Sequence, residues 1–166
     1  MAVEKIKRSQ VAHFLNTAAE RSPEQWSRIN KGVSELAIAY NPEVTTEKYI
    51  GDDNASSELE NYAPNAPVSM KAYKGDPVFD FVNGLRKSRA TGEDCKTQLL
   101  NVDIFDTSDS STYYAEKQDV IVQIDTWGGD ASATLEFTLV YSGDPVVGTA
   151  KISQGNVTFS DAAAAA

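Results

Sequence analysis

The feature that most constrains the fold of this chain is a series of β-rich segments in its C-terminal half. The segments are rich in β-branched and aromatic residues, and the turn-like sequences "DTSDSS", "GGDA" and "SGDP" separate them. They span residues 97–105, 112–127, 132–141 and 146–159, and an earlier segment at 34–40 alternates in a similar way. Strands at this spacing are typical of antiparallel sheets. We therefore expect a mainly β protein, either an antiparallel β-sandwich or a partly closed barrel.

One segment interrupts this pattern with the signals of a helix. In "KGDPVFDFVNGLRKSRA", Asp76 suits an N-cap, Pro77 suits the first helical position, and apolar residues then recur at helical spacing. We expect one flanking α-helix over about 75–90. Gly84 lies inside this helix although glycine costs about 1 kcal/mol there relative to alanine. That cost suggests that another part of the chain packs closely on Gly84.

The rest of the chain divides into an arm, a domain and a tail. A length of 166 residues fits one domain with its own core. Residues 1–33 keep no clean apolar period, so we expect an N-terminal arm there, followed by a β-sandwich domain at 34–161. The alanines at 162–166 carry no pattern and no assignable role.

A long polar stretch, "NPEVTTEKYIGDDNASSELENYAPNAPV", begins at Asn41 and contains three prolines. Connections longer than about 12–15 residues without structure of their own are uncommon in compact domains, and they are usually functional or disordered. Here "EVTTEKYI" and "ELENY" flank the turn signal "GDDN". We therefore expect a long hairpin loop between two strands, covering residues 41–67.

The net charge of −9 is unevenly distributed. Twelve acids and twelve bases balance through Gly92, whereas the twelve acids after it face only three lysines. This excess argues against adhesive binding of nucleic acid, which needs lysine and arginine to displace counterions from phosphates. The sequence contains no apolar run long enough to span a membrane and no pattern of a signal peptide.

Few residues offer catalytic or metal-binding chemistry. His13 is the only histidine and Cys95 the only cysteine, so a nucleophile–histidine site would have to be built around one polar segment. Asp103, Asp106 and Asp109 are spaced three apart, which differs from the spacing of a calcium loop and is typical of a solvated turn. We expect no enzymatic activity, no metal and no cofactor.

Alternation assigns faces to two of the expected strands. Val120, Val122 and Ile124 share one face of their strand, and residues 119, 121, 123 and 125 share the other. In the next strand, residues 135, 137, 139 and 141 are apolar, and the residues between them are polar. The outward faces are therefore acidic and hydroxyl-bearing.

The order of the segments resembles a known family. "AIAYNPEVTTEKYIGDDNAS", "NYAPNAPV", "KGDPVFDFVNGLRKSRA" and "YAEKQDVIVQIDTWGGDASATLEFTLVYSGDPVVGT" together resemble the major tail proteins, or tail tube proteins, of long-tailed bacteriophages and prophages of Gram-positive bacteria. The resemblance covers nearly the whole chain and is weakest in the first thirty residues and the last dozen.

The resemblance implies a structural protein of the virion, assembled in the host cytoplasm. Its subunits would form hexameric rings stacked into a tube, with the inner sheets joined around a channel for the genome and the long hairpin reaching the adjoining ring. It also implies a tape measure protein and a tail terminator as partners, and passage of double-stranded DNA without adhesion.

Two sets of residues are predicted to serve these roles. Alternation and charge predict that the channel-facing residues include Asp119, Gln123, Asp125, Glu136 and Thr138. The inter-ring contact is predicted in the long hairpin, at Tyr49, Asp52, Asp53, Leu59 and Tyr62.

Two other classes remain open. A tail terminator or connector protein of similar fold would stop at a single ring. A capsid-decoration or carbohydrate-binding β-sandwich would instead use aromatic residues such as Tyr113, Tyr114 and Trp127 as a platform, although their alternation with core residues favours strand-face packing.

Overall fold

The computed structural model of the chain describes residues 2–107, 109 and 111–162. The alanines at 163–166 lie outside the described residues. The described part is mainly β with one α-helix, which confirms the predicted fold class. In chain order its elements are η1 (Arg8–Gln10), β1 (Val11–Asn16), β2 (Trp26–Arg28), β3 (Val33–Leu36), β4 (Pro42–Glu47), β5 (Ser56–Tyr62), β6 (Asn65–Lys71), α1 (Pro77–Ser88), η2 (Gly92–Cys95), β7 (Lys96–Thr107), β8 (Thr112–Gly128), β9 (Thr134–Tyr141), β10 (Val146–Ser153) and β11 (Asn156–Asp161).

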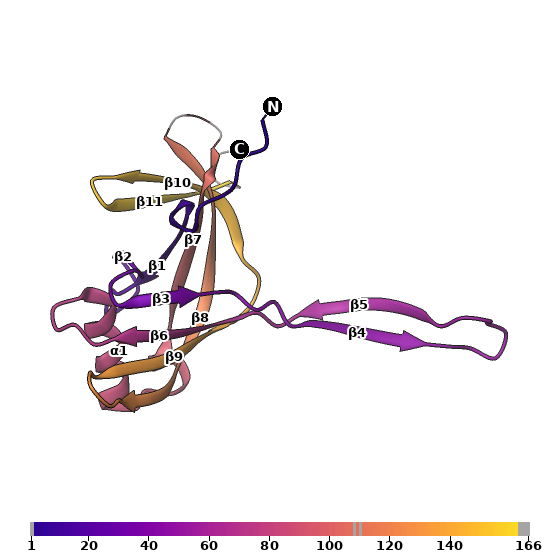
Figure 1. The fold of residues 1–166 in the computed structure, drawn as a ribbon, viewed down its shortest axis with the longest axis horizontal. Coiled ribbons are helices and arrows are strands. Elements are labelled where there is room, and N and C mark those ends of the chain that lie inside the picture. Colours follow the sequence, from indigo (N-terminus) through magenta and orange to yellow (C-terminus); the bar gives the residue numbers. More distant parts are fainter. Residues whose placement is uncertain (1, 108, 110, 163–166) are drawn as a thin grey trace.

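A single antiparallel sheet contains every strand except β4 and β5. Its strands follow the order β2-β1-β7-β8-β9-β6-β3. The long strand β8 pairs with β10 through its first half and with β9 through its second half, and β11 pairs with β10. The sheet curls strongly, so that β3 lies near β1 and β2 (Figure 1). The result is the partly closed barrel that was one of the two expected forms.

Two hydrophobic cores hold this sheet, one on each side. Leu15 and Leu99 pair across β1 and β7 and face the larger core, which α1 and the strands β6, β8 and β9 also enclose. Their neighbours Phe14 and Leu100 face the second core, which β10 and β11 cover. The second half of β8, together with β9, β6 and β3, has only the larger core behind it. That four-stranded region therefore keeps one face in solvent.

The helix begins and ends as its sequence signals predict, but its packing differs. The Asp76 carboxylate accepts a hydrogen bond from the amide of Phe79 at 3.0 Å, and Arg89 adopts a left-handed conformation just past the last turn. The ring of Phe79 is buried, and its centre lies 6.0 Å from that of Trp127. The expectation of close packing at Gly84 is wrong: this residue is exposed, and nothing lies within 4 Å of the position that a Cβ would occupy.

The N-terminal region differs from the expected arm. Residues 11–16 form β1 in the interior of the sheet, between β2 and β7. Ala12 and Phe14 are buried on one face, and His13 and Leu15 are buried on the other. A strand that is buried on both faces shows no alternation, which is why its sequence gave no period.

The predicted long loop also contains a strand that its prolines concealed. Ala66, Val68 and Met70 alternate as buried residues of β6, so the predicted loop at 41–67 ends before this strand. Pro67 pairs with Thr138 of β9 on one side, while the ladder with β3 ends at the pair Leu36–Val68. The missing amide hydrogen of Pro67 is therefore tolerated, because the ladder on that side is interrupted between this pair and the isolated bridge Ala39–Asn65.

Candidate assembly surfaces

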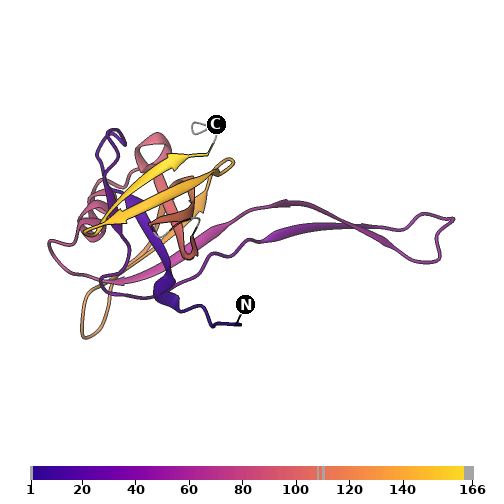
Figure 2. The same cartoon turned by 90° about the horizontal axis from the view of Figure 1, so that it is seen from above.

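A two-stranded hairpin projects from the body of the protein. Strands β4 and β5 pair only with each other, and every residue from 42 to 62 is exposed. Two perpendicular views show the hairpin extending far beyond the sheet (Figures 1 and 2). At its base the rings of Tyr40 and Tyr62 meet edge to face, 6.2 Å apart. The hairpin therefore has backbone order without a core of its own.

The projecting hairpin, residues 42–62, has two unlike faces. Val44 and Leu59 are directly paired, so their side chains lie on the same face and form an exposed apolar patch there. The opposite face is acidic and gathers the glutamates Glu43, Glu47, Glu58 and Glu60. The register shifts beside Val44, so that Glu60 is the extra residue of a bulge and joins the acidic face.

The predicted inter-ring residues occupy three parts of this hairpin. Tyr49, Asp52 and Asp53 lie in the turn, where the Tyr49 amide donates to the Asp52 carboxylate at 3.2 Å. The Tyr49 hydroxyl also donates to the carboxylate of Glu47, which raises the pKa of the tyrosine. Leu59 lies on the apolar face, and Tyr62 lies at the base.

The predicted channel-facing residues lie on the solvent face of the four-stranded region, which we call the outer sheet face. Gln123 donates to the Asp125 carboxylate at 2.7 Å, and the Thr138 hydroxyl donates to the other oxygen of the same carboxylate at 2.7 Å. Asp119 lies further along β8 and accepts from Gln98 at 3.4 Å. Glu136 is exposed on β9. The structure thus places all five residues on one face and brings three of them into one hydrogen-bonded group.

A β-bulge at Asp125 adds a residue that the alternation missed. The pairing of β8 with β9 shifts between Ile124 and Thr126. Consequently Thr126 also faces outward and donates to the Glu136 carboxylate at 2.5 Å. Trp127 returns to the core side, where its ring contacts Phe79 of α1. A bulge leaves no reliable signal in a single strand's sequence, and alternation continued past Asp125 would place Thr126 on the core face.

Glu35 is a second residue of this face that the sequence did not indicate. It lines a shallow depression with Asp125 and Glu136, above Pro67 and Ser69. Glu35 lies on this face because β3 pairs with β6. The sequence predicted β3 but not β6, so this neighbour could not be foreseen. The depression therefore presents three carboxylates to solvent.

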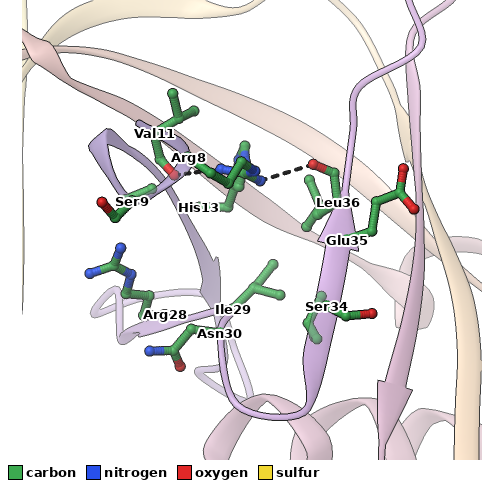
Figure 3. Close-up of a pocket in the computed structure, with 12 residues that line it drawn as sticks. Arg8, Ser9, Val11, His13, Arg28, Ile29, Asn30, Ser34, Glu35 and Leu36 are labelled. Atoms are coloured by element: carbon green, nitrogen blue, oxygen red, sulfur yellow. Dashed lines mark hydrogen bonds between the residues drawn. The ribbon is translucent and has the colours of Figure 1, made fainter. Parts of the chain in front are cut away.

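Two open strand edges bound the four-stranded region, and a groove follows each. In β8, residues 122–128 pair with β9 alone, because the ladder with β7 ends at Ile121. The groove beside this edge is lined by Ile121, Ile124, Arg86 and Arg89. At the other end of the region, β3 pairs only with β6. The groove beside β3 contains Arg8, Arg28 and His13 (Figure 3).

His13 is held by both ring nitrogens. Its Nδ1 lies 2.7 Å from the side-chain oxygen of Asn101, and its Nε2 lies 3.0 Å from a guanidinium nitrogen of Arg8. Because Arg8 can only donate, the imidazole is neutral, with its proton on Nδ1. Burial lowers the pKa of His13 below its usual 6.5. Arg8 also donates to the carbonyls of Val11 and Leu36, and so links the start of β1 to the end of β3.

The described residues contain no group of three or more His, Cys, Asp or Glu side chains placed to hold a metal ion. Among the same residues, no helix has the length and apolar character needed to cross a membrane.

Comparison with known proteins finds likeness of structure only. No family model and no curated protein sequence matches the chain. A chain from the tail of an empty GTA particle, computed with helical refinement and C6 symmetry, has a TM-score of 0.61 at 11% identity and covers 85% of this chain and 97% of that chain. A chain from the 6-fold symmetrised baseplate of the anti-feeding prophage has a TM-score of 0.49 at 12% identity, covering 89% and 97%. The first likeness shows that this chain shares the fold of a tail component.

Proposed function

We propose that this chain is a structural, non-enzymatic subunit of a phage tail tube. The observation that carries the proposal is the projecting hairpin, which is ordered over residues 42–62 yet buries none of them in its own subunit. Exposed apolar side chains such as Val44, Leu59 and Ile50 are costly to leave in water, and contact with another subunit would remove that cost. A hairpin of this kind is suited to contact with another subunit.

The open edges of the sheet support a ring. An unpaired strand edge is an aggregation hazard unless it is covered or paired, and closure of a ring would pair the two edges that bound the four-stranded region. We propose that the free edge of β8 in one subunit joins the free edge of β3 in the next. The shared fold with a C6-symmetric tail supports six subunits in each ring.

The outer sheet face would then line the channel. Glu35, Asp125 and Glu136 are all exposed on it. DNA carries one negative charge per about 1.7 Å of helix, so an acidic wall repels it instead of binding it. The repulsion acts within a Debye length of about 8–10 Å, which limits contact with the wall without closing the channel. In this proposal, as in the resemblance noted from the sequence, a tape measure protein and a tail terminator are further partners.

Electron microscopy of the purified protein tests the proposal. We expect long tubes built from stacked rings, with the outer sheet face lining the lumen. Single rings would favour a terminator or connector protein, and monomers would favour a decoration or carbohydrate-binding module. Tubes whose lumen is lined by another surface would refute the channel assignment while leaving the assembly role intact.

A further inference from the structure

The charges of the projecting hairpin are nearly all of one sign and lack ion-pair partners within the described part of its own subunit. Residues 42–62 contain one base, Lys48, against a much larger set of acids, which comprises Glu43, Glu47, Asp52, Asp53, Glu58 and Glu60. Within the described residues, none of these acids is in ion-pair distance of a lysine or arginine. The hairpin is thus a strongly anionic projection that carries an apolar patch.

A small basic surface lies at the opposite end of the strands that carry the hairpin. Lys31, Lys71, Tyr73 and Lys74, which we call the lysine rim, are all exposed, and none of its lysines forms an ion pair within the described part of the chain. The Lys31 ammonium lies 4.9 Å from the centre of the Tyr73 ring. Tyr73 and the lysine stems also offer apolar surface beside the charges.

The lysine rim is rigidly built. The amide of Lys71 donates to the carbonyl of Gly32 at 3.1 Å, which joins the turn before β3 to the end of β6. Gly32 has φ of +77°, and a Cβ there would lie 2.7 Å from the Lys71 carbonyl oxygen, so the two segments touch through backbone. Order of this kind lowers the entropic cost of docking.

The acids nearest to the lysine rim in sequence are engaged by backbone amides, although they keep their negative charge. The Asp76 carboxylate accepts from the Phe79 amide, and the Asp80 carboxylate accepts from the Gly75 amide at 3.4 Å. Asp130, in the turn before β9, adds one acid at this end of the sheet. The three lysines of the rim form no ion pair with these acids within the described residues, and their own charge is opposite in sign to that of the hairpin.

The topology places the projecting hairpin and the lysine rim at opposite ends of strands β3 and β6. The hairpin is inserted between the end of β3 and the start of β6, whereas the lysine rim adjoins the start of β3 and the end of β6. Figure 1 shows the hairpin extending from one end of these strands, with the rim loops at the other. At about 3.3 Å per residue, β6 spans roughly 20 Å and the hairpin reaches roughly 30 Å. A second copy shifted along the strand direction therefore meets the hairpin with its lysine rim.

From this arrangement we propose that the lysine rim is the docking surface for the acidic hairpin of a second copy of this chain. The inference rests on the proposed tube function and adds the receiving surface. The contact is heterologous, because two different patches meet, and it can repeat from ring to ring without limit. Charge pairing at its edge sets register and association rate, and the apolar patch of the hairpin adds buried area.

Reversal of charge tests the contact. A K31E/K74E variant should stack at least about tenfold more weakly than the wild type, as judged by tube length in micrographs and by sedimentation. Adding E58K and E60K to the same chain should restore tubes. The matched control K87E/K151E changes the same charge at exposed sites away from the lysine rim and should assemble normally. Circular dichroism and thermal melts verify that every variant folds.

The possible outcomes distinguish a failure of the proposed docking surface from a failure of the proposed tube function. Tubes of normal length from K31E/K74E, or an equal loss in K87E/K151E, would overturn the docking surface and leave the tube function standing. A wild-type chain that remains monomeric or stops at single rings would overturn both. Tubes lost in the rim variant and restored by the hairpin reversal would establish the contact.

Discussion

Removal of the projecting hairpin should abolish assembly without harming the fold. The variant replaces residues 43–61 with Asn-Gly, which suits a two-residue turn between the paired residues Pro42 and Tyr62. The contacts at the base are retained, including the Tyr40–Tyr62 ring contact and the bridge between Ala39 and Asn65. Only residues that are exposed in the subunit are lost.

The expected change in stability is small and favourable. The removed segment buries no side chain, so no hydrophobic term is lost. The connection between β3 and β6, residues 37–64, shortens from 28 residues to about 11, and loop-closure entropy then favours the variant by about 0.8 kcal/mol. Denaturant titration should therefore give a free energy of unfolding equal to that of the wild type or slightly higher.

Micrographs of the same variant should contain no tubes. A Ser57→Ala substitution is the control, because it removes one hydroxyl contact and leaves the acids and the apolar patch in place. Normal tubes from the shortened chain would refute the role of the hairpin. A loss of more than about 2 kcal/mol in unfolding free energy would show that the hairpin supports the fold, contrary to its exposure.

Two further predictions concern the body of the protein. The free energy of unfolding should fall as the pH drops below 6.5, because burial lowers the pKa of His13 and the unfolded chain then binds a proton that the native chain excludes. Titrations between about pH 5 and pH 8 should show this slope, and a His13→Gln variant with an unchanged slope would refute the assignment. Gly84→Ala should raise the free energy of unfolding by roughly 0.5–1 kcal/mol, because the position is exposed within α1 and has open space around it. A lower melting temperature for this variant would contradict the helix geometry.

Strands with one buried face and one solvent-exposed face were predictable, because their sequences alternate between apolar and polar residues. In β8, Val120 and Val122 alternate with Asp119 and Gln123, so both the strand and its faces follow from period two. The helix was predictable for a different reason, since Asp76 and the following proline mark its start in the sequence itself.

Strands β1 and β6 were not predictable in the same way. In β1, Phe14 and Leu15 are both buried, one in each core, so the chain shows no alternation to detect. In β6 the buried residues do alternate, but Pro67 is a strong signal against a strand unless the ladder beside it is known to be interrupted there. Both failures have one cause: the environment of a strand depends on what lies beside it, and one segment's sequence does not contain that information.

The bulge at Asp125 connects the core, the outer sheet face and the open edge of β8. Without it, strict alternation from Ile124 would turn Trp127 outward, away from Phe79 and from the Arg86 guanidinium, 4.6 Å from the Trp127 ring. With it, Trp127 stays on the core side of the sheet against Phe79, although it is 42% exposed, while Asp125 and Thr126 both face outward and hydrogen-bond to residues of β9. The same bulge interrupts a free edge, and an irregular edge pairs poorly with arbitrary strands. In the proposed ring, an edge of this shape would favour a neighbouring subunit whose strand matches its register over random aggregation.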